Sequence, residues 1–337
     1  MTRCRTRRAG SAAVAGAALA VLLALAACGS TPPTPGPTPS GNRPVAPATG
    51  GRATSWTATP RPPAQVSPYS KVMVIAEENE PESSVIGSSQ APYLTKLAAT
   101  YGQATNMQAG YPTACPSLAA YILMTSGSQQ GICDDEPPAN HQLSGDNIFK
   151  QVTDAGLEWR EYAESMPQSC RTTNSSDGLY LVRHAPPPYY TSESGRCDAW
   201  DVPLGTTTSG ALHAALATGL PSYSFVTPNA CNDMHGAPSC QTTIIKSGDN
   251  WLAKWMPQII ASDDFQQARL VVLITWDEGS GTTNHIPTLV VARTVRGLSS
   301  AAAYTHCSTL RLAEDSLGLP RLGCAATAAS FRTGFRF

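Results

Sequence analysis

The sequence predicts a three-layer α/β/α sandwich built on a mostly parallel central sheet. Residues 71–76 and 270–275 are continuous apolar runs, which are typical of strands buried on both faces of a sheet. Further strand-like runs at 158–163, 222–227 and 286–292 alternate with segments of helical spacing. Strands that alternate with helices favour a parallel sheet covered by helices on both faces.

Residues that commonly start or end helices, such as proline and glycine, indicate where the helices and one more strand lie. Helices are expected over residues 91–101, 147–155, 249–261 and 305–317, and a short strand over 180–183. The third of these helices contains Pro257, which lacks the backbone N–H that a helix interior uses, so we expect it to be kinked or split. All these elements fall within residues 70–337, a length that suits one large domain.

Residues 1–28 have the pattern of a targeting segment. Four arginines precede an apolar run over 12–27, which ends in Ala26-Ala27-Cys28. This ending resembles a bacterial lipobox, in which Cys28 is lipidated and becomes the first residue of the mature chain. An ordinary signal peptide that carries a cysteine is the alternative. A lipid on Cys28 would hold the exported chain on the outer face of the cell membrane without spanning it.

Residues 29–69 are expected to form a disordered tether. They contain 11 prolines with many threonines, serines and glycines, and no acidic residue. A segment of this composition cannot bury a core and stays extended. The sequence therefore predicts a domain over 70–337 that is lifted away from its anchor.

The charge of the chain argues against nucleic-acid binding, and its cysteines indicate an exported protein. Without the targeting segment the chain has 19 basic and 24 acidic residues and no basic run. A nucleic-acid partner is therefore not expected, because phosphate backbones are bound by clustered Lys and Arg. Eight cysteines remain besides Cys4 and Cys28, with no CxxC pair, which indicates disulfides in an exported protein. Their spacing predicts four local pairs: Cys115–Cys133, Cys170–Cys197, Cys231–Cys240 and Cys307–Cys324.

Acidic residues follow both of the continuous apolar strands. The first strand is followed by Glu77-Glu78-Asn79-Glu80, and the second by Asp277-Glu278-Gly279. Open α/β sheets bind ligands at the carboxyl ends of their strands, and carboxylates packed together repel unless a cation neutralises them. The pattern indicates a hard divalent cation such as Mg²⁺, Ca²⁺ or Mn²⁺. The alternative is a solvated acidic turn after each core strand.

Ser117 stands at the start of an apolar segment of helical spacing that ends at Ser126-Gly127. Serine is a favoured N-cap, so a cap would explain it without any chemistry. The alternative is a nucleophile, because a helix N-terminus offers N–H groups and a positive dipole end to a phosphate. A neighbouring metal ion would lower the pKa of its hydroxyl.

The order of these motifs resembles the bacterial phosphoesterase family, which includes acid phosphatases and phospholipase C enzymes and is related to the alkaline-phosphatase superfamily. The resemblance rests on five motifs in order: Glu78-Asn79, Pro116-Ser117-Leu118, residues 229–235, Trp276-Asp277-Glu278-Gly279 and Tyr304-Thr305-His306. It covers nearly all of residues 70–337 and implies a phosphoesterase catalytic domain with an alkaline-phosphatase-like fold.

The resemblance also implies a role for each matching residue. The metal ligands it implies are Glu78, Asn79, Ser117, Asp233, Asp277 and Glu278. The implied ion is divalent: Mg, Ca, Mn or Zn. Ser117 is also the implied nucleophile, which forms a phosphoserine intermediate. The histidines that would hold phosphate or protonate the leaving alkoxide are His235 and His306, with a structural role as the alternative. The residues expected to bind substrate are Asn232, Arg183 and His184, with a surface ion pair as the alternative for the last two.

The expected activity is hydrolysis of phosphomonoesters by an exported, metal-dependent acid phosphatase, with phosphoinositides among the substrates that the family suggests. A phospholipase C or another phosphodiesterase is the alternative enzyme. Two departures from the family pattern, Glu80 in place of His and Ala119-Ala120 in place of Pro-Asn, motivate a third hypothesis, a catalytically degenerate surface binding protein. The expected partners are a phosphate ester and, through Cys28, a membrane surface. We expect a monomer.

Overall fold

The computed structural model describes residues 68–279 and 284–337. The predicted signal peptide, Cys28 and all but the end of the predicted tether lie outside the described residues. Among the described residues, no helix is both long enough and apolar enough to cross a membrane. Tyr69 is already fully buried, and its hydroxyl lies 2.8 Å from Thr294 Oγ1, so the packed domain includes the last residue assigned to the tether.

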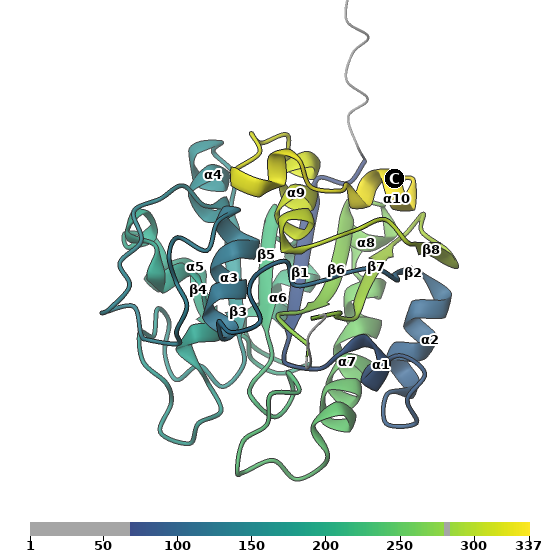
Figure 1. Ribbon diagram of the computed structural model, residues 1–337, viewed down its shortest axis with the longest axis horizontal. Coiled ribbons are helices and arrows are strands. Elements are labelled where there is room, and N and C mark those ends of the chain that lie inside the picture. Colours follow the sequence, from purple (N-terminus) through teal and green to yellow (C-terminus); the bar gives the residue numbers. More distant parts are fainter. Residues whose placement is uncertain (1–67, 280–283) are drawn as a thin grey trace, which may run out of the picture. The chain divides into compact units, whose positions relative to one another are not determined.

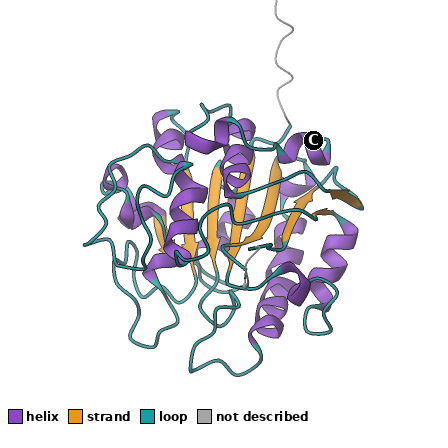
Figure 2. Ribbon diagram, viewed as in Figure 1, coloured by secondary structure: helices purple, strands orange, loops and turns teal. Residues whose placement is uncertain are grey.

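One eight-stranded sheet forms the centre of the domain (Figure 1, Figure 2). Its strand order is β4-β3-β5-β1-β6-β7-β2-β8. The strands are β1 (Lys71–Glu77), β2 (Gly102–Ala104), β3 (Trp159–Ala163), β4 (Asp201–Pro203), β5 (Tyr223–Thr227), β6 (Leu270–Trp276), β7 (Thr288–Ala292) and β8 (Leu298–Ser300). Only β7 runs against its neighbours, and all the other pairs are parallel. The prediction of a mostly parallel sheet is therefore confirmed.

Helices cover both faces of this sheet. Figure 1 shows α3, α4 and α9 in front of it and α6, α7 and α8 behind it. The helices are α1 (Glu82–Val85), α2 (Pro92–Thr100), α3 (Ser117–Ser126), α4 (Ile148–Asp154), α5 (Cys197–Trp200), α6 (Ala211–Thr218), α7 (Ile244–Ala261), α8 (Asp263–Gln266), α9 (His306–Leu317) and α10 (Phe331–Phe335). The three layers bury the apolar residues of β1 and β6 completely, as their continuous apolar runs predicted, and those of β5 as well.

Two predicted elements differ in the structure. Helix α7 begins earlier than expected and continues through Pro257 without being split. Residues 180–183 are not a strand, because Val182–His184 forms a short 3-10 helix, η1. The backbone N–H groups that a strand would give to a neighbour are taken by nearby side chains: Tyr180 N–H by Ser175 Oγ at 2.9 Å and Val182 N–H by Asn174 Oδ1 at 2.9 Å.

All four predicted disulfides are present. Cys115–Cys133 joins the segment before α3 to the loop that follows this helix, and Cys231–Cys240 closes the loop after β5. Cys307–Cys324 ties the first turn of α9 to the C-terminal segment. Each bridge closes a local loop, and loops of this size typically contribute about 2–4 kcal/mol to stability. They therefore fix the segments that lie nearest to the carboxyl ends of the central strands.

Candidate active site

The two acidic strand ends converge because β1 and β6 are parallel neighbours. Their register pairs Glu77 with Trp276, and the ladder extends one step further through Asp277 N–H, which donates to the Glu77 carbonyl at 2.9 Å. Asn79 then takes a left-handed conformation, φ 56°, which asparagine tolerates better than most residues. Its backbone N–H donates to Asp277 Oδ1 at 3.0 Å. The predicted meeting of these strand ends is confirmed, with Glu78 and Asp277 both fully buried there.

Ser117 opens α3 beside these carboxylates. Pro116 is the N-cap of the helix and Ser117 is its first residue, so the cap interpretation fails. The Ser117 hydroxyl instead donates to Glu78 Oε2 at 3.0 Å, and Ser117 is 3% exposed. Tyr121 lies one turn further along the same face of α3 and donates to Glu78 Oε1 at 2.5 Å. Sequence reasoning missed Tyr121, although its spacing of four from Ser117 was a usable signal.

His184 is enclosed beneath this cluster rather than exposed to substrate. Its Nδ1 lies 3.2 Å from Asp233 Oδ2, and its Nε2 lies 3.3 Å from Glu78 Oε1 without hydrogen-bond geometry. The ring stacks on Tyr121 with centroids 5.4 Å apart. Asp233 uses its other carboxylate oxygen to accept the His235 N–H at 2.8 Å. Both oxygens of Asp233 are thus engaged within the protein, and burial lowers the pKa of His184 well below its usual value.

Arg183 lies at the outer side of the cluster. It donates from a guanidinium nitrogen to His235 Nε2 at 2.9 Å, while His235 Nδ1 donates to the Gly236 carbonyl at 2.9 Å. Arg183 Nε also lies 3.2 Å from Asp135 Oδ2. Asp135 Oδ1 in turn accepts the Leu118 N–H of α3 at 3.1 Å. The sequence showed the acidic pair that contains Asp135 but gave no role for it.

The amide group of Asn232 is engaged by other side chains of the protein. Its amide group donates to Glu164 Oε2 at 2.9 Å, and its amide oxygen accepts from Ser247 Oγ at 3.0 Å. These contacts place it on the wall of a separate cleft of about 480 Å³, between the loops after β3 and β5 and helix α7. The structure therefore brings together Glu78, Asn79, Ser117 and Asp277, with Arg183 and His235 beside them, and directs the Asn232 side chain elsewhere.

His306 and Glu278 lie on the other side of Asp277. His306 is fully buried and its Nε2 donates to the Asp277 carbonyl at 2.5 Å. Burial lowers its pKa to about 4, so the ring is a neutral donor. Glu278 accepts from the Tyr111 hydroxyl at 2.9 Å, and the Tyr111 ring stacks on His306. Tyr111 carried no recognisable sequence signal, because it lies in an irregular segment before the Ser117 motif.

The buried carboxylates repel one another and raise their own pKa values. The pKa of Asp277 rises to about 7, because of burial and then the neighbouring Glu278. That of Glu78 is raised well above its usual value by burial, Asp277 and Asp233. Two oxygen atoms here, Asn79 Oδ1 and Asp277 Oδ2, are buried without a hydrogen-bond partner. This is the electrostatic pattern of a site that a cation would relieve.

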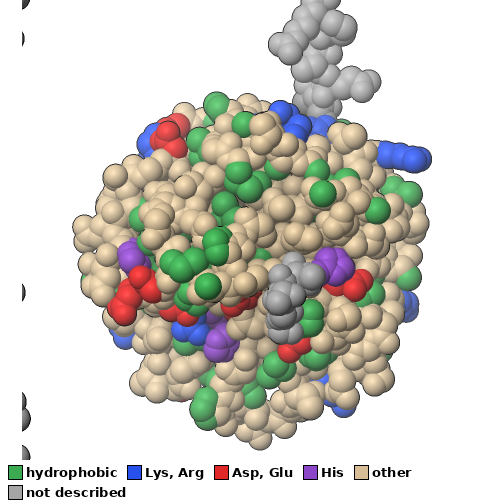
Figure 3. Space-filling model, in the orientation of Figure 1, with side chains coloured by type: hydrophobic (Ala, Val, Ile, Leu, Met, Phe, Trp, Pro, Cys, Tyr) green, Lys and Arg blue, Asp and Glu red, His purple; other side chains and the backbone are tan. Residues whose placement is uncertain are grey.

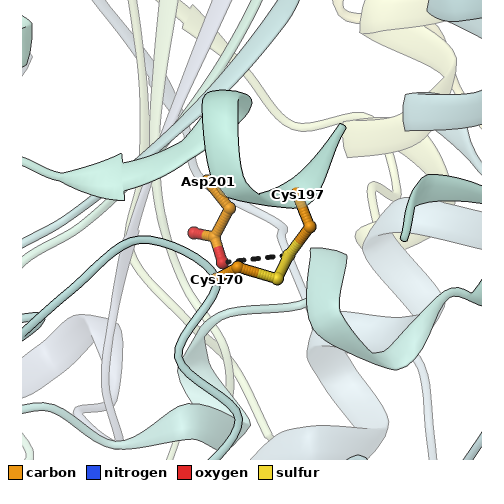
Figure 4. A group of neighbouring side chains, drawn as sticks. All are labelled: Cys170, Cys197 and Asp201. Carbon is orange, nitrogen blue, oxygen red and sulfur yellow. Dashed lines mark hydrogen bonds between the residues drawn. A yellow bond between two sulfur atoms is a disulfide. The ribbon is translucent and has the colours of Figure 1, made fainter. Parts of the chain in front are cut away.

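Metal-ligating atoms cluster most tightly elsewhere in the described chain. Cys170, Cys197 and Asp201 are the three residues of such types whose ligand atoms lie within 4.8 Å of one another (Figure 4). They do not form a metal site, because the two sulfur atoms are bonded to each other as a disulfide. The carboxylates of Glu78, Asp277 and Glu278 do not converge to that distance. The compact part of the candidate site therefore joins two carboxylates to amide and hydroxyl oxygens.

Charged side chains mark the candidate site on the surface. Figure 3 shows acidic, basic and histidine side chains together on the face where α3 and α9 lie, around the lower end of α3. That end of α3 is its N-terminus, at the carboxyl ends of the parallel strands. Ligands of open α/β sheets bind at this edge.

A serine hydroxyl among carboxylates at this edge of an α/β sheet is consistent with a phosphoric ester hydrolase, and the comparisons establish that class. Residues 78–320 match the model of the Phosphoesterase family, so the chain belongs to that family. It is 29% identical over 261 residues to the phosphatidylinositol-3-phosphatase of Mycobacterium tuberculosis, covering 77% of this chain and 81% of that protein. It is 26% identical over 227 residues to a probable acid phosphatase of Kluyveromyces lactis, covering 62% of this chain and 50% of that protein.

Solved structures support the fold. A Vibrio parahaemolyticus protein of the alkaline phosphatase superfamily superposes with a TM-score of 0.53 at 10% identity. The match covers 79% of this chain and 72% of that one. At this identity the likeness concerns the fold alone. It agrees with the three-layer α/β/α architecture predicted from the sequence.

Proposed function

We propose that the protein is an exported, metal-dependent acid phosphatase that hydrolyses phosphomonoesters through a phosphoserine at Ser117. The observation that carries the proposal is the position of Ser117 Oγ, 3.0 Å from Glu78 Oε2 at the N-terminus of α3. A capping serine would direct its hydroxyl oxygen at a backbone N–H of its own helix. Here the hydroxyl faces the acid cluster, where a phosphoryl group and a cation would meet it.

The residues present fit a divalent cation. Asn79 Oδ1 and Asp277 Oδ2 are buried without a partner, and orphaned oxygen atoms of this kind are costly unless something binds them. With Glu78, Ser117 and Glu278 they offer only oxygen donors, which suit Mg²⁺, Ca²⁺ or Mn²⁺ and are also used by Zn²⁺. When bound, the ion supplies a Lewis acid for the phosphoryl and serine oxygens. Asp233 has both oxygens engaged by His184 and His235 N–H, so we assign it to holding the site together rather than to the ion.

The proposed reaction has two steps. Ser117 gives up its hydroxyl proton on the side where Glu78 Oε2 accepts its hydrogen bond, and Oγ forms a bond to phosphorus as the ester oxygen leaves. Water then attacks the phosphoserine and gives a proton to His235, while the serine oxygen leaves phosphorus and takes back the proton held at Glu78, which releases phosphate and restores the hydroxyl. Arg183 is placed to bind phosphate oxygens, because a guanidinium pairs well with them. The leaving alkoxide takes a proton in the first step.

Of the two predicted histidines, we assign that proton to His235. It is half-buried, and burial lowers its pKa. To act as the acid it must be protonated at Nε2, which then gives up the Arg183 hydrogen bond and donates to the leaving oxygen, while Nδ1–H stays on the Gly236 carbonyl. His306 is enclosed and donates to the Asp277 carbonyl, so its role is to hold the turn that carries Asp277 and Glu278. His184 and Asp233 have the same supporting role on the Glu78 side.

The proposed substrates are phosphomonoesters, with phosphoinositides among them. Relatives named acid phosphatase and phosphatidylinositol-3-phosphatase support this class. The family departures, Glu80 and Ala119-Ala120, replace neither the proposed nucleophile Ser117 nor any of the proposed metal ligands. This favours an active enzyme over a degenerate binding protein.

The proposed location is the outer face of the cell membrane, with a lipid on Cys28 and residues 29–69 as the tether. Four disulfides support an oxidising compartment. We propose that the enzyme works there as a monomer.

Turnover of p-nitrophenyl phosphate and bis(p-nitrophenyl) phosphate, each with and without EDTA, tests the proposal. We expect the monoester to be the better substrate and EDTA to abolish its turnover. Higher kcat/KM for the diester would favour the phosphodiesterase alternative. No turnover of either ester with Mg²⁺, Ca²⁺, Mn²⁺ or Zn²⁺ supplied would favour the degenerate binding protein.

A further inference from the structure

Asp135 bridges two groups that a substrate phosphate needs. Its Oδ1 accepts the Leu118 N–H, the amide next to Ser117, at 3.1 Å. Its Oδ2 lies 3.2 Å from Arg183 Nε. Leu118 follows Ser117 in the chain, and Arg183 lies close enough to act electrostatically on Glu78, which accepts the Ser117 hydroxyl. A phosphoryl group bonded to Ser117 Oγ would therefore lie near both donors. The Asp135 carboxylate therefore occupies the place where the phosphate of a substrate would bind.

The pairing with Arg183 is incomplete. Arg183 Nε is buried, yet it has no hydrogen-bond acceptor, because the 3.2 Å contact with Asp135 lacks the required geometry. Planar pairing between a guanidinium and an oxyanion is strong only when the N–H groups point at the oxygens. The Asp135 side chain is 34% exposed, against 16% for Arg183. Asp135 is thus the more accessible and the less firmly held partner.

We propose that the Asp135 carboxylate occupies the phosphate position of the resting protein and that substrate phosphate displaces it from Arg183 and the N-terminus of α3. This inference rests on the proposed function. It makes Asp135 a residue that sets affinity for phosphate by competing with it.

Arg183 keeps its place when Asp135 leaves. A second anchor, the 2.9 Å hydrogen bond from its guanidinium to His235 Nε2, is independent of Asp135. The backbone near Asp135 is also fixed separately, by the disulfide at Cys133 and by the contact of Asp134 with His141 at 2.5 Å. Release of Asp135 therefore requires rotation of one side chain and no movement of Arg183.

Charge decides the direction of the effect. A phosphate dianion beside Arg183 gains from the guanidinium and is repelled by a retained Asp135, since like charges a few ångströms apart disfavour each other. Removing the carboxylate takes away both the competitor and the repulsion. If Asp135 instead served to hold Arg183 for the substrate, its removal would weaken phosphate binding.

Asp135→Asn is the variant that tests this proposal, because it keeps an oxygen for the Leu118 N–H while it removes the charge. The measurement is the Kd of inorganic phosphate by isothermal titration calorimetry at constant pH, salt and divalent metal. We expect the Kd to fall at least about fivefold, because without its charge the side chain competes more weakly for Arg183 and no longer repels the phosphate. Asp134→Asn is the matched control: it removes the same charge from the neighbouring residue but keeps an Oδ1 atom for the His141 contact, and should leave the Kd nearly unchanged.

An unchanged or higher Kd in Asp135→Asn overturns the proposal, as does an equal fall in both variants. Binding of phosphate is read without turnover, so the result stands whether or not the wild-type protein hydrolyses p-nitrophenyl phosphate. A wild-type protein that binds phosphate but does not hydrolyse p-nitrophenyl phosphate would count against the proposed function and not against the role of Asp135. If Asp135→Asn unfolds, Asp135→Glu provides the second measurement. Its longer side chain keeps the charge and should retain a Kd close to that of the wild type.

Discussion

Asp277→Asn should make the stability of the metal-free protein less dependent on pH between pH 5 and pH 7. Asp277 is fully buried, and its pKa rises from 3.8 to about 7 because of burial and Glu278. The folded chain keeps this proton up to about pH 7, whereas the unfolded chain releases it near pH 3.8. Stability is therefore lost as pH rises between these values, by about 1.4 kcal/mol for each unit.

The rise of the Asp277 pKa from 3.8 to about 7 corresponds to about 4 kcal/mol in total, of which about 2 kcal/mol falls between pH 5 and pH 7. Asparagine cannot ionise, so Asp277→Asn should lack this loss. Urea unfolding of both proteins in EDTA at pH 5 and pH 7 measures it. We expect the variant to lose about 2 kcal/mol less than the wild type over this interval.

Added divalent metal should stabilise the wild type more than Asp277→Asn at pH 7. Ligands that bind only the folded state stabilise it, so the wild type should gain stability at pH 7 and the variant much less. The affinity of the wild type for the ion should also rise with pH, because the ion displaces the Asp277 proton. If the EDTA-treated wild type and Asp277→Asn lose equal stability from pH 5 to pH 7, the reasoning about this carboxylate is refuted.

Three further predictions follow from other parts of the molecule. Tyr121→Phe removes the 2.5 Å hydrogen bond to Glu78, so we expect a loss of about 1–3 kcal/mol in unfolding free energy and a lower kcat; wild-type values for both would contradict the role given to this hydroxyl. Asp201 pairs with Glu161 across β3 and β4, and burial raises the pKa of both, so their ionisation should destabilise the fold as pH rises. Asp201→Asn should therefore raise the Tm at pH 8 more than at pH 5, and an equal change at both would refute this. Mass spectrometry of the mature N-terminus should find a lipid on Cys28; a free N-terminus at another residue would exclude the anchor.

The central strands were predictable because their apolar runs are continuous. Residues buried on both faces of a sheet leave no alternation, and both β1 and β6 show this pattern. The acidic residues after β1 and β6 were predicted to lie close together, and they do so because the two strands are parallel neighbours. The short strands β2, β4 and β8 were not predictable, since each has three residues and takes its position from its neighbours.

The candidate site was predictable only in part, because contacts depend on packing and not on local sequence. The sequence left Ser117 between a cap and a nucleophile, and the orientation of its hydroxyl toward Glu78 decided against the cap. Asn232 was expected at the substrate, but Glu164 and Ser247 take its amide group. The contact of Asp135 with Arg183 joins residues 48 positions apart, and no local pattern specifies it.

The most direct test of the account is a search for phosphate on Ser117 during turnover. The enzyme is mixed with excess p-nitrophenyl phosphate and the proposed metal ion, quenched in acid within its turnover time, digested and examined by mass spectrometry. The account predicts phosphoserine in the peptide that contains Ser117, and none in Ser117→Ala, which should also have lost most of its activity. Full turnover without phosphate on Ser117, or near-normal activity in Ser117→Ala, would contradict it.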